Sequence, residues 1–237
     1  MNTAAVNTLG ERVKRVRERM NEAARRSGRS VEEVTLVAVS KTHPIAAIQE
    51  GLDMGLTHFG ENRVQEAEQK IPGIAGAKWH LIGHLQSNKA RRAVELFDVI
   101  HSLDSAQLAQ RLDRICEELD RRSLPVLIQV DLGHETTKTG LTEEEVREAA
   151  KTVASCHRLQ LVGLMTLPPF FEAAEKVRPY FRRLRMLRDE LRAEGVFEDQ
   201  RGELSMGMTH DFEIAIEEGA TMVRVGTAIF GERERIH

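Results

Sequence analysis

Residues 126–131 have the sequence Val-Leu-Ile-Gln-Val-Asp, and this pattern is the strongest indication of fold in the chain. The segment begins with three apolar residues in a row, whereas a strand with one solvated face alternates apolar and polar residues. Continuous apolar runs are typical of strands that are buried on both faces of a parallel sheet. Residues 126–131 therefore predict a parallel sheet that is covered on both sides.

Similar short apolar segments occur on either side of this one, and amphipathic helical stretches separate them. The eight predicted strands are Thr35–Ser40, Thr57–Phe59, Lys78–Ile82, Val99–Ser102, Val126–Asp131, Leu161–Thr166, Glu203–Ser205 and Met222–Val225. The predicted helices between them are Ile45–Met54, Val64–Lys70, Ser87–Leu96, Ala106–Arg122, Glu143–Ser155, Glu172–Ala193 and Asp211–Glu218. Eight β/α units in 237 residues predict a closed (β/α)₈ barrel that forms a single domain over residues 1–237, with a doubly wound open sheet as the alternative.

An additional helix is predicted ahead of the first strand, where it would pack outside the barrel. Its apolar residues recur at helical spacing and are Leu9, Val13, Val16, Met20 and Ala24. The other face is rich in arginine but also carries Glu11, Glu18 and Glu22. This mixture of charges indicates a solvated face and not a patch for nucleic acid.

The composition excludes several classes of protein. The chain has 34 Lys and Arg against 37 Asp and Glu, a net charge of −3, and only 4% aromatic residues. Neither a basic surface for nucleic acid nor an aromatic platform for single strands is expected. No apolar stretch is long enough to span a bilayer, and no apolar segment resembling a secretory signal precedes the first charges. With only two cysteines, the chain is expected to be a cytoplasmic protein without disulfides.

Lys41 is the first candidate for chemistry, because it directly follows the predicted strand Thr35–Ser40. Active sites of (β/α)₈ barrels lie at the carboxyl ends of the strands. Partial desolvation at such a rim lowers the pKa of a lysine, and the free amine can form a Schiff base with a carbonyl compound. A lysine that simply ends a strand in solvent is the simpler interpretation of this residue taken alone.

The loops after the last two strands are the second candidate. They contain Ser205 and Gly207, and Gly226 and Thr227, so they offer hydroxyl groups together with backbone that a ligand can approach closely. In this fold the same two loops often bind phosphate. Ordinary turns would explain the spacing equally well.

Arg224 is the third candidate, because it interrupts the apolar strand Met222–Val225. An arginine is rarely buried without a partner, so Arg224 should contact a carboxylate or a ligand. A lysine amine, a phosphate site and an arginine around one barrel mouth together suggest pyridoxal phosphate (PLP).

The sequence resembles the pyridoxal phosphate homeostasis protein family, whose members are small relatives of alanine racemase. The resemblance rests on ordered segments along nearly the whole chain. They are Leu36-VAVSKTH-Pro44, Phe59-GENRVQ-Glu66, Trp79-HLIGHLQSN-Lys89, His101-SLD-Ser105, Val126-LIQV-Asp131, Lys138-T-Gly140, Gly163-L-Met165, and Leu204-SMG-Met208 through Thr221-MVRVGTAIFGE-Arg233. It implies a barrel of the alanine racemase N-terminal type.

The resemblance also implies which residues bind the cofactor. The implied set is Lys41 as the Schiff-base lysine, Asn62 beside the ring, Arg224 at the pyridine nitrogen, and Ser205, Gly226 and Thr227 with the backbone near Met206 at the phosphate. An arginine stays charged and discourages protonation of the ring, which makes the cofactor a weaker electron sink.

The function that the resemblance implies is a carrier or buffer of PLP in vitamin B6 homeostasis, without robust turnover. The chain has no second, β-rich domain of the kind that completes the alanine racemase site. The family implies a monomer, with apo forms of PLP-dependent enzymes as possible recipients of the cofactor. The alternatives are a weak PLP-dependent amino-acid racemase and a Schiff-base aldolase that uses no PLP.

The chain departs from the family pattern at one position, His43. Many relatives have a second lysine at this position, and if that lysine helps to hand over the cofactor, transfer is expected to differ here. Lys138 matches a family lysine and is a possible transient acceptor of the cofactor. His80 and His84 have the spacing of metal ligands on a helix, but a strand end and a turn separate them, so no metal site is predicted.

Overall fold

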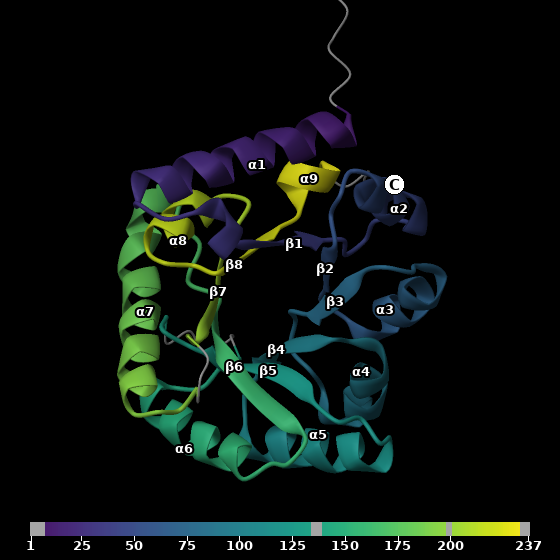
Figure 1. The fold of residues 1–237 in the computed structure, drawn as a ribbon, viewed down its shortest axis with the longest axis vertical. Coiled ribbons are helices and arrows are strands. Elements are labelled where there is room, and N and C mark those ends of the chain that lie inside the picture. Colours follow the sequence, from purple (N-terminus) through teal and green to yellow (C-terminus); the bar gives the residue numbers. More distant parts are fainter. Residues whose placement is uncertain (1–7, 134–138, 198–200, 233–237) are drawn as a thin grey trace, which may run out of the picture.

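Eight parallel strands close into a barrel in sequence order, and β8 pairs back onto β1 (Figure 1). The computed structural model describes residues 8–133, 139–197 and 201–232. The strands are β1 (Thr35–Val39), β2 (His58–Glu61), β3 (Lys78–Leu81), β4 (Val99–Leu103), β5 (Leu124–Val130), β6 (Leu159–Thr166), β7 (Glu203–Met208) and β8 (Met222–Val225). The predicted (β/α)₈ barrel is confirmed, and the alternative of an open doubly wound sheet is wrong.

Helices follow the strands in turn and form the outer layer of the ring (Figure 1). They are α2 (Ile45–Asp53), α3 (Val64–Lys70), α4 (Ala90–Leu96), α5 (Ala106–Glu118), α6 (Glu143–Ala154), α7 (Arg178–Ala193), α8 (Phe212–Glu217) and α9 (Thr227–Phe230). Local capping explains several starts, because the Ser105 hydroxyl accepts from the Leu108 N–H, and Thr142 and Glu145 form a capping box. Among the described helices, none combines the length and apolar character that crossing a bilayer requires.

Several predicted helices have different limits in the structure, since the one predicted over Ser87–Leu96 begins at Ala90 after a 3₁₀ turn and the one predicted over Ala106–Arg122 ends at Glu118. The helix predicted over 172–193 begins only at Arg178, after a short 3₁₀ turn over Ala174–Val177. Pro179 explains this start, because a proline has no N–H to donate and fits only the first turn of a helix. The helix α9 was not predicted, since a single turn is too short to show a 3.6-residue period.

Helix α1 (Leu9–Arg26) is the predicted additional helix, and it lies across the outside of the barrel against α8 and α9 (Figure 1). Its start is fixed by a capping box between Thr8 and Glu11. Its charged face is not entirely solvated, which corrects the expectation from sequence. Arg19 and Arg26 bind Glu213 and Glu217 of α8, each at 2.7 Å, so part of this face fastens α1 to the barrel.

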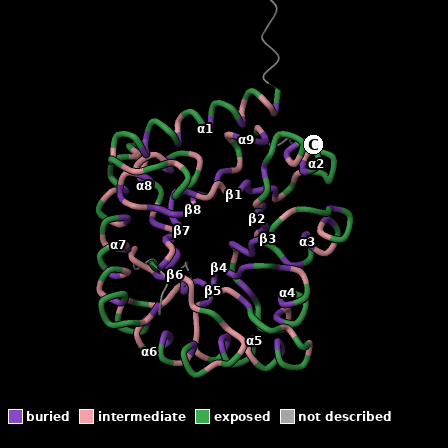
Figure 2. The backbone as a smooth tube through the Cα atoms, viewed as in Figure 1, coloured by how far each residue is buried: buried purple, intermediate pink, exposed green. Residues whose placement is uncertain are grey.

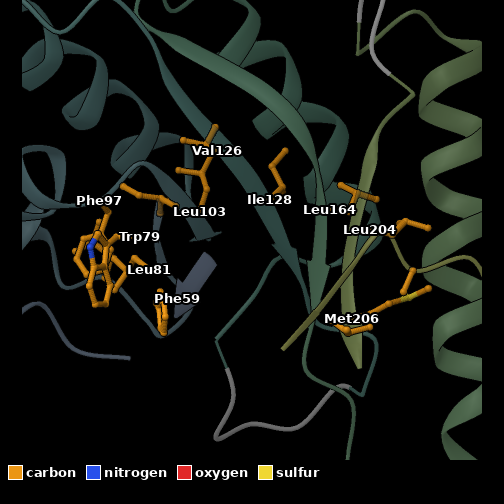
Figure 3. Close-up of a cluster of buried hydrophobic side chains, with 14 of the residues drawn as sticks. Phe59, Trp79, Leu81, Phe97, Leu103, Val126, Ile128, Leu164, Leu204 and Met206 are labelled. Atoms are coloured by element: carbon orange, nitrogen blue, oxygen red, sulfur yellow. The ribbon is translucent and has the colours of Figure 1, made fainter. Parts of the chain in front are cut away.

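The buried hydrophobic residues form two clusters, and the strands of the ring consist largely of buried residues (Figure 2). The larger cluster forms an outer layer between the barrel and its helices and includes Phe59, Trp79 and Met206 (Figure 3). The smaller one consists of Val99, Leu127 and Met165. Burying a side chain of this size stabilises a fold by about 1.5–3 kcal/mol, so the outer layer supplies most of the apolar stabilisation.

The segment 126–131 shows how both faces of one strand are buried. Val126 and Ile128 belong to the outer layer, whereas Leu127 between them belongs to the cluster of Val99 and Met165. Gln129 is also buried, and its amide donates to the carbonyl oxygen of Thr139. The prediction of a strand covered on both sides is therefore confirmed.

Candidate functional site

The predicted site residues come from strands that meet at one end of the barrel. Lys41 follows β1, Asn62 follows β2, and Gly226 follows β8. These three strands are neighbours in the closed sheet, with β1 between the other two. Because the carboxyl ends of parallel strands lie at the same mouth of a barrel, the three residues stand around one opening. The backbone of Gly226 approaches β1 closely, since a Cβ on it would lie 3.4 Å from the Val39 carbonyl oxygen.

Lys41 lies between two residues whose main chain is held in place. The Ser40 carbonyl oxygen accepts a hydrogen bond from Lys70 Nζ at 2.8 Å, and the Thr42 N–H donates to the Glu66 carboxylate. Thr42 has φ of 68°, a left-handed conformation that is unfavourable for a β-branched residue. The surrounding contacts therefore impose the backbone turn that carries Lys41.

Glu61 connects this turn to the barrel wall. Its side chain is fully buried at the end of β2, where Oε1 accepts from Lys70 Nζ at 2.9 Å and from the Ser40 hydroxyl at 2.7 Å. Burial raises the pKa of Glu61, and the hydrogen bonds from Lys70 and Ser40 oppose that rise. Its other oxygen has no hydrogen-bond partner among the described residues. The carboxylate is therefore stabilised mainly by a single lysine.

Asn62 is packed against the loop that follows β3. A Cβ on Gly83 would lie 2.3 Å from the Asn62 carbonyl oxygen, so only glycine allows these two backbones to lie so close together. Asn62 and Gly83 both line a cavity of about 670 Å³, together with Arg63, His84 and Lys89. The cavity places Asn62 beside a space that is accessible to a ligand.

The loops after β7 and β8 contact each other through Thr209. Its hydroxyl oxygen accepts from the Gly226 N–H at 3.3 Å and lies 3.5 Å from the Ala228 nitrogen. Gly207 lies within β7, which extends to Met208 and not only to Ser205 as predicted; its φ is 90°, and a Cβ there would lie 2.5 Å from the Ala215 Cβ, so this position requires glycine. The Met206 side chain belongs to the outer apolar layer (Figure 3), which leaves only its backbone for a ligand. Thr227 begins α9 and is exposed.

Arg224 is 2% exposed, and its described partners are both neutral. Its guanidinium donates to the Ser205 hydroxyl oxygen at 2.6 Å and to the Thr166 carbonyl oxygen at 2.9 Å. Burial lowers the pKa of Arg224 to about 10, with the charge of Asp211 opposing the shift, so the group stays charged at neutral pH. A charged guanidinium has five N–H donors, and this arrangement leaves some of them for a ligand.

A row of histidines behind Arg224 was not predicted. The His101 Nδ1 atom lies 2.8 Å from the Ser205 hydroxyl oxygen, and His80 and His58 continue the row outward. Because β4 and β7 are not neighbours in the sheet, the contact between His101 and Ser205 crosses the barrel interior. His84 belongs to a separate contact, 2.9 Å from Asp104, so the two histidines of the rejected metal motif do not act together.

Because His80 and His101 are buried, we expect the barrel to lose stability in acid. Burial lowers the pKa of His80 to about 3 and that of His101 well below its usual value, so both are neutral in the folded protein. The unfolded chain takes up a proton on each below about pH 6.5. Unfolding should therefore become easier by about 1.4 kcal/mol per pH unit for each histidine as the pH falls below 6.5.

Denaturant titrations at several pH values between 7 and 5 would measure this slope. A His80→Gln variant, with one buried histidine fewer, should show a slope smaller by about 1.4 kcal/mol per pH unit. Free energies of unfolding that do not change over this range would contradict the neutral state of these histidines.

Comparisons with known proteins agree with this geometry. Residues 12–234 match the family model described as alanine racemase, N-terminal domain. Alanine racemase of Clostridium difficile shares the fold, with a TM-score of 0.70 at 15% identity, and the chain covers 58% of that longer protein. Fold and site together define a barrel of the alanine racemase N-terminal class.

Within this class the chain belongs to the pyridoxal phosphate homeostasis protein family. It is 44% identical to such a protein from Aquifex aeolicus, over 94% of this chain and 98% of the relative. It is 43% identical to the one from Escherichia coli, over 97% and 98%. Among solved structures, PipY of Synechococcus elongatus with PLP bound has a TM-score of 0.81 at 41% identity, and the match covers 94% of this chain and all of PipY.

Proposed function

We propose that this protein binds PLP at the barrel mouth, holds it on Lys41, and thereby buffers or delivers the cofactor in the cell. One observation carries the proposal. Lys41, Asn62, Arg224 and Gly226 surround one mouth in a chain that is 41% identical to PipY, which was solved with PLP bound. The relatives that match over almost their full length have the name of homeostasis proteins.

The residues at the mouth fit the chemical groups of PLP. The cofactor supplies an aldehyde, with which a lysine amine forms an imine and releases water. In this proposal Lys41 provides that amine, on a turn held by Lys70 and Glu66. Arg224 donates toward the pyridine nitrogen, and because it stays charged it opposes a proton there. Asn62 lies beside the ring.

The phosphate is assigned to the loops after β7 and β8. Gly226 allows close approach to its backbone, Thr227 offers a hydroxyl, and Met206 contributes through its backbone; the Gly226 N–H itself donates to the Thr209 hydroxyl at 3.3 Å. The resemblance implies that Ser205 is at the phosphate; because its hydroxyl contacts Arg224 and His101, our proposal gives it a role on the ring side instead. Lys138 lies outside the described residues. His43 stacks on Phe230 of α9 with ring centroids 5.0 Å apart, which assigns it to the rim of the mouth.

A carrier without robust turnover is preferred to the weak racemase. Arg224 disfavours a protonated ring and thus weakens the electron-withdrawing power on which racemisation depends. The aldolase alternative would leave Arg224 and the phosphate loops without a purpose. Sustained racemisation of an amino acid that depends on added PLP and is lost in Lys41→Ala would favour the racemase. Apo forms of PLP-dependent enzymes are the proposed recipients.

Absorption spectroscopy followed by borohydride reduction would test the proposal. Purified protein incubated with PLP should show the visible band of an imine, and the band should disappear on reduction. Peptide mass analysis should then find one phosphopyridoxyl group per chain, on Lys41. Absence of the band after incubation with PLP, or modification at scattered lysines, would overturn the proposal.

A further inference from the structure

A continuous row of hydrogen-bonding side chains crosses the inside of the barrel and ends at Arg224. The His58 Nδ1 atom lies 2.9 Å from His80 Nε2, and His80 Nδ1 lies 2.8 Å from His101 Nε2. The row then passes through His101 Nδ1 and the Ser205 hydroxyl to the Arg224 guanidinium, at 2.8 and 2.6 Å. It therefore connects strands β2, β3 and β4 with β7 and β8 across the interior.

The outer end of the row lies far from the mouth. His58 is the first residue of β2, at the amino-terminal end of the barrel, whereas Lys41 and Gly226 follow the carboxyl ends of their strands. His58 is half-buried and lines a cavity of about 770 Å³ that is also lined by Val13 and Arg17 of α1. His80 and His101, by contrast, are 1% and 0% exposed. Only the outermost histidine is thus accessible to solvent.

Each histidine in the row is a neutral imidazole with one donor nitrogen and one acceptor nitrogen. Burial keeps the pKa values of His80 and His101 far below neutrality and also lowers the pKa of His58. In a neutral imidazole one nitrogen carries the proton, and the other can only accept. The direction of one hydrogen bond therefore fixes the directions of all the others.

Arg224 and Ser205 together favour one of the two directions, because a guanidinium can only donate and the Ser205 hydroxyl has one proton of its own to donate. The Ser205 oxygen accepts from it, and the only acceptor for the Ser205 hydroxyl proton among the described residues is His101 Nδ1. His101 must then carry its proton on Nε2 and donate to His80 Nδ1. His80 in turn donates through Nε2 to His58 Nδ1, which leaves the His58 Nε2–H toward the cavity.

We propose that His58, His80 and His101 form a positioning chain that holds Ser205 and Arg224 in the orientation that binds the pyridine nitrogen of PLP. This inference rests on the proposed function and adds a regulatory element to the same site. The hydrogen bonds of this positioning chain can run in two self-consistent directions. Only when they run from Ser205 toward His58 does the Ser205 hydroxyl proton have an acceptor within the row. A change at the amino-terminal end of the barrel that reverses the direction therefore alters the donors at the mouth.

A pair of substitutions at His58 separates this role from simple packing. In His58→Asn the amide oxygen can replace Nδ1 as the acceptor for His80. In His58→Phe the ring volume is kept, but the acceptor is lost, which leaves a buried N–H on His80 without a partner. Reversal of the hydrogen bonds removes this unpaired N–H. His80 then carries its proton on Nδ1 and donates it to His101, and His101 donates to Ser205.

Long-range ¹H–¹⁵N spectra of the labelled apo protein would read the tautomers directly. Wild type and His58→Asn should both carry the proton on Nε2 of His80 and His101. In His58→Phe both histidines should carry it on Nδ1, although residue 58 does not touch His101. Protons on Nδ1 in the wild type, or identical tautomers in all three proteins, would overturn the positioning chain.

The rate of PLP release supplies the second readout. It is measured on holo protein that has not been reduced with borohydride, as the loss of the visible band in the presence of excess scavenger. His58→Phe should release PLP about 5-fold faster or more, and His58→Asn at nearly the wild-type rate. Reversed tautomers with unchanged release would overturn the coupling to the site while leaving PLP binding intact. A wild type that fails to bind PLP would instead overturn the proposed function, and with it the coupling, whatever tautomers are found.

Discussion

Lys41→Ala is expected to abolish covalent retention of PLP and to leave the barrel folded. Alanine has no amine with which to form an imine, so borohydride reduction should leave no phosphopyridoxyl group on the chain. The turn itself should persist, because the Ser40 carbonyl and the Thr42 N–H on either side of Lys41 are both held by hydrogen bonds. Mass spectrometry of the reduced protein measures the first effect, and thermal unfolding of the apo forms measures the second.

Lys41→Arg is the matched control, since it keeps a positive charge at this position and equally lacks a primary amine. Both variants should lose the reduced adduct. The wild type should also gain thermal stability as free PLP is raised, because a ligand that binds only the folded state stabilises it by mass action. A reduced adduct in Lys41→Ala would show that another lysine is the attachment site. A large loss of apo stability would show that Lys41 has a structural role.

Lys70→Met is expected to destabilise the fold by about 3–5 kcal/mol, since it leaves a buried carboxylate without its cation. Glu61 is 0% exposed, and Lys70 is its charged partner at 2.9 Å. Methionine matches the length of the lysine stem but cannot donate to Glu61 or to the Ser40 carbonyl oxygen. Denaturant unfolding of the apo protein at neutral pH measures the loss.

The double variant Lys70→Met/Glu61→Gln separates the charge from the packing. It removes the uncompensated carboxylate and should recover much of the stability lost in the single variant. The loss in Lys70→Met should also shrink as the pH is lowered, because a protonated Glu61 needs no cation. Equal losses in the single and double variants would show that Lys70 stabilises the turn through its contacts with the Ser40 carbonyl and Glu66 and not through Glu61.

The fold was predictable because its signals are local and repeated. Each strand is a short apolar run and each long helix has its own periodicity, so the alternation of the two was visible without knowledge of contacts. The limits of the elements were less predictable. The short helix Thr227–Phe230 has too few residues to show a period, and the start of α7 depends on Pro179 within a stretch that is amphipathic on both sides.

The site was predictable only in part, because some of its residues stand out in the sequence and others do not. Lys41 and Arg224 stand out because each is a charge at the end of, or within, an apolar strand. The histidine chain has no such signal, since His58, His80 and His101 are separated by 22 and 21 residues and each is ordinary in its local context. Which residues of a strand face the barrel interior depends on strand register, and the pairing between β4 and β5 contains a shift.

The pairing of β8 with β1 has a consequence for biosynthesis. Lys41 emerges early during translation, whereas Arg224 and Gly226 belong to the last strand and loop of the barrel. At a synthesis rate of about 5–20 residues per second, roughly 10–40 seconds separate the two halves of the site on the ribosome. A nascent or truncated chain that ends before β8 carries Lys41 without Arg224 or the loop that is proposed to bind the phosphate. If PLP is held as proposed, a growing chain therefore gains the full site only once β8 and the loop after it have been made, and shorter chains should withdraw little of the cofactor from the cell's supply.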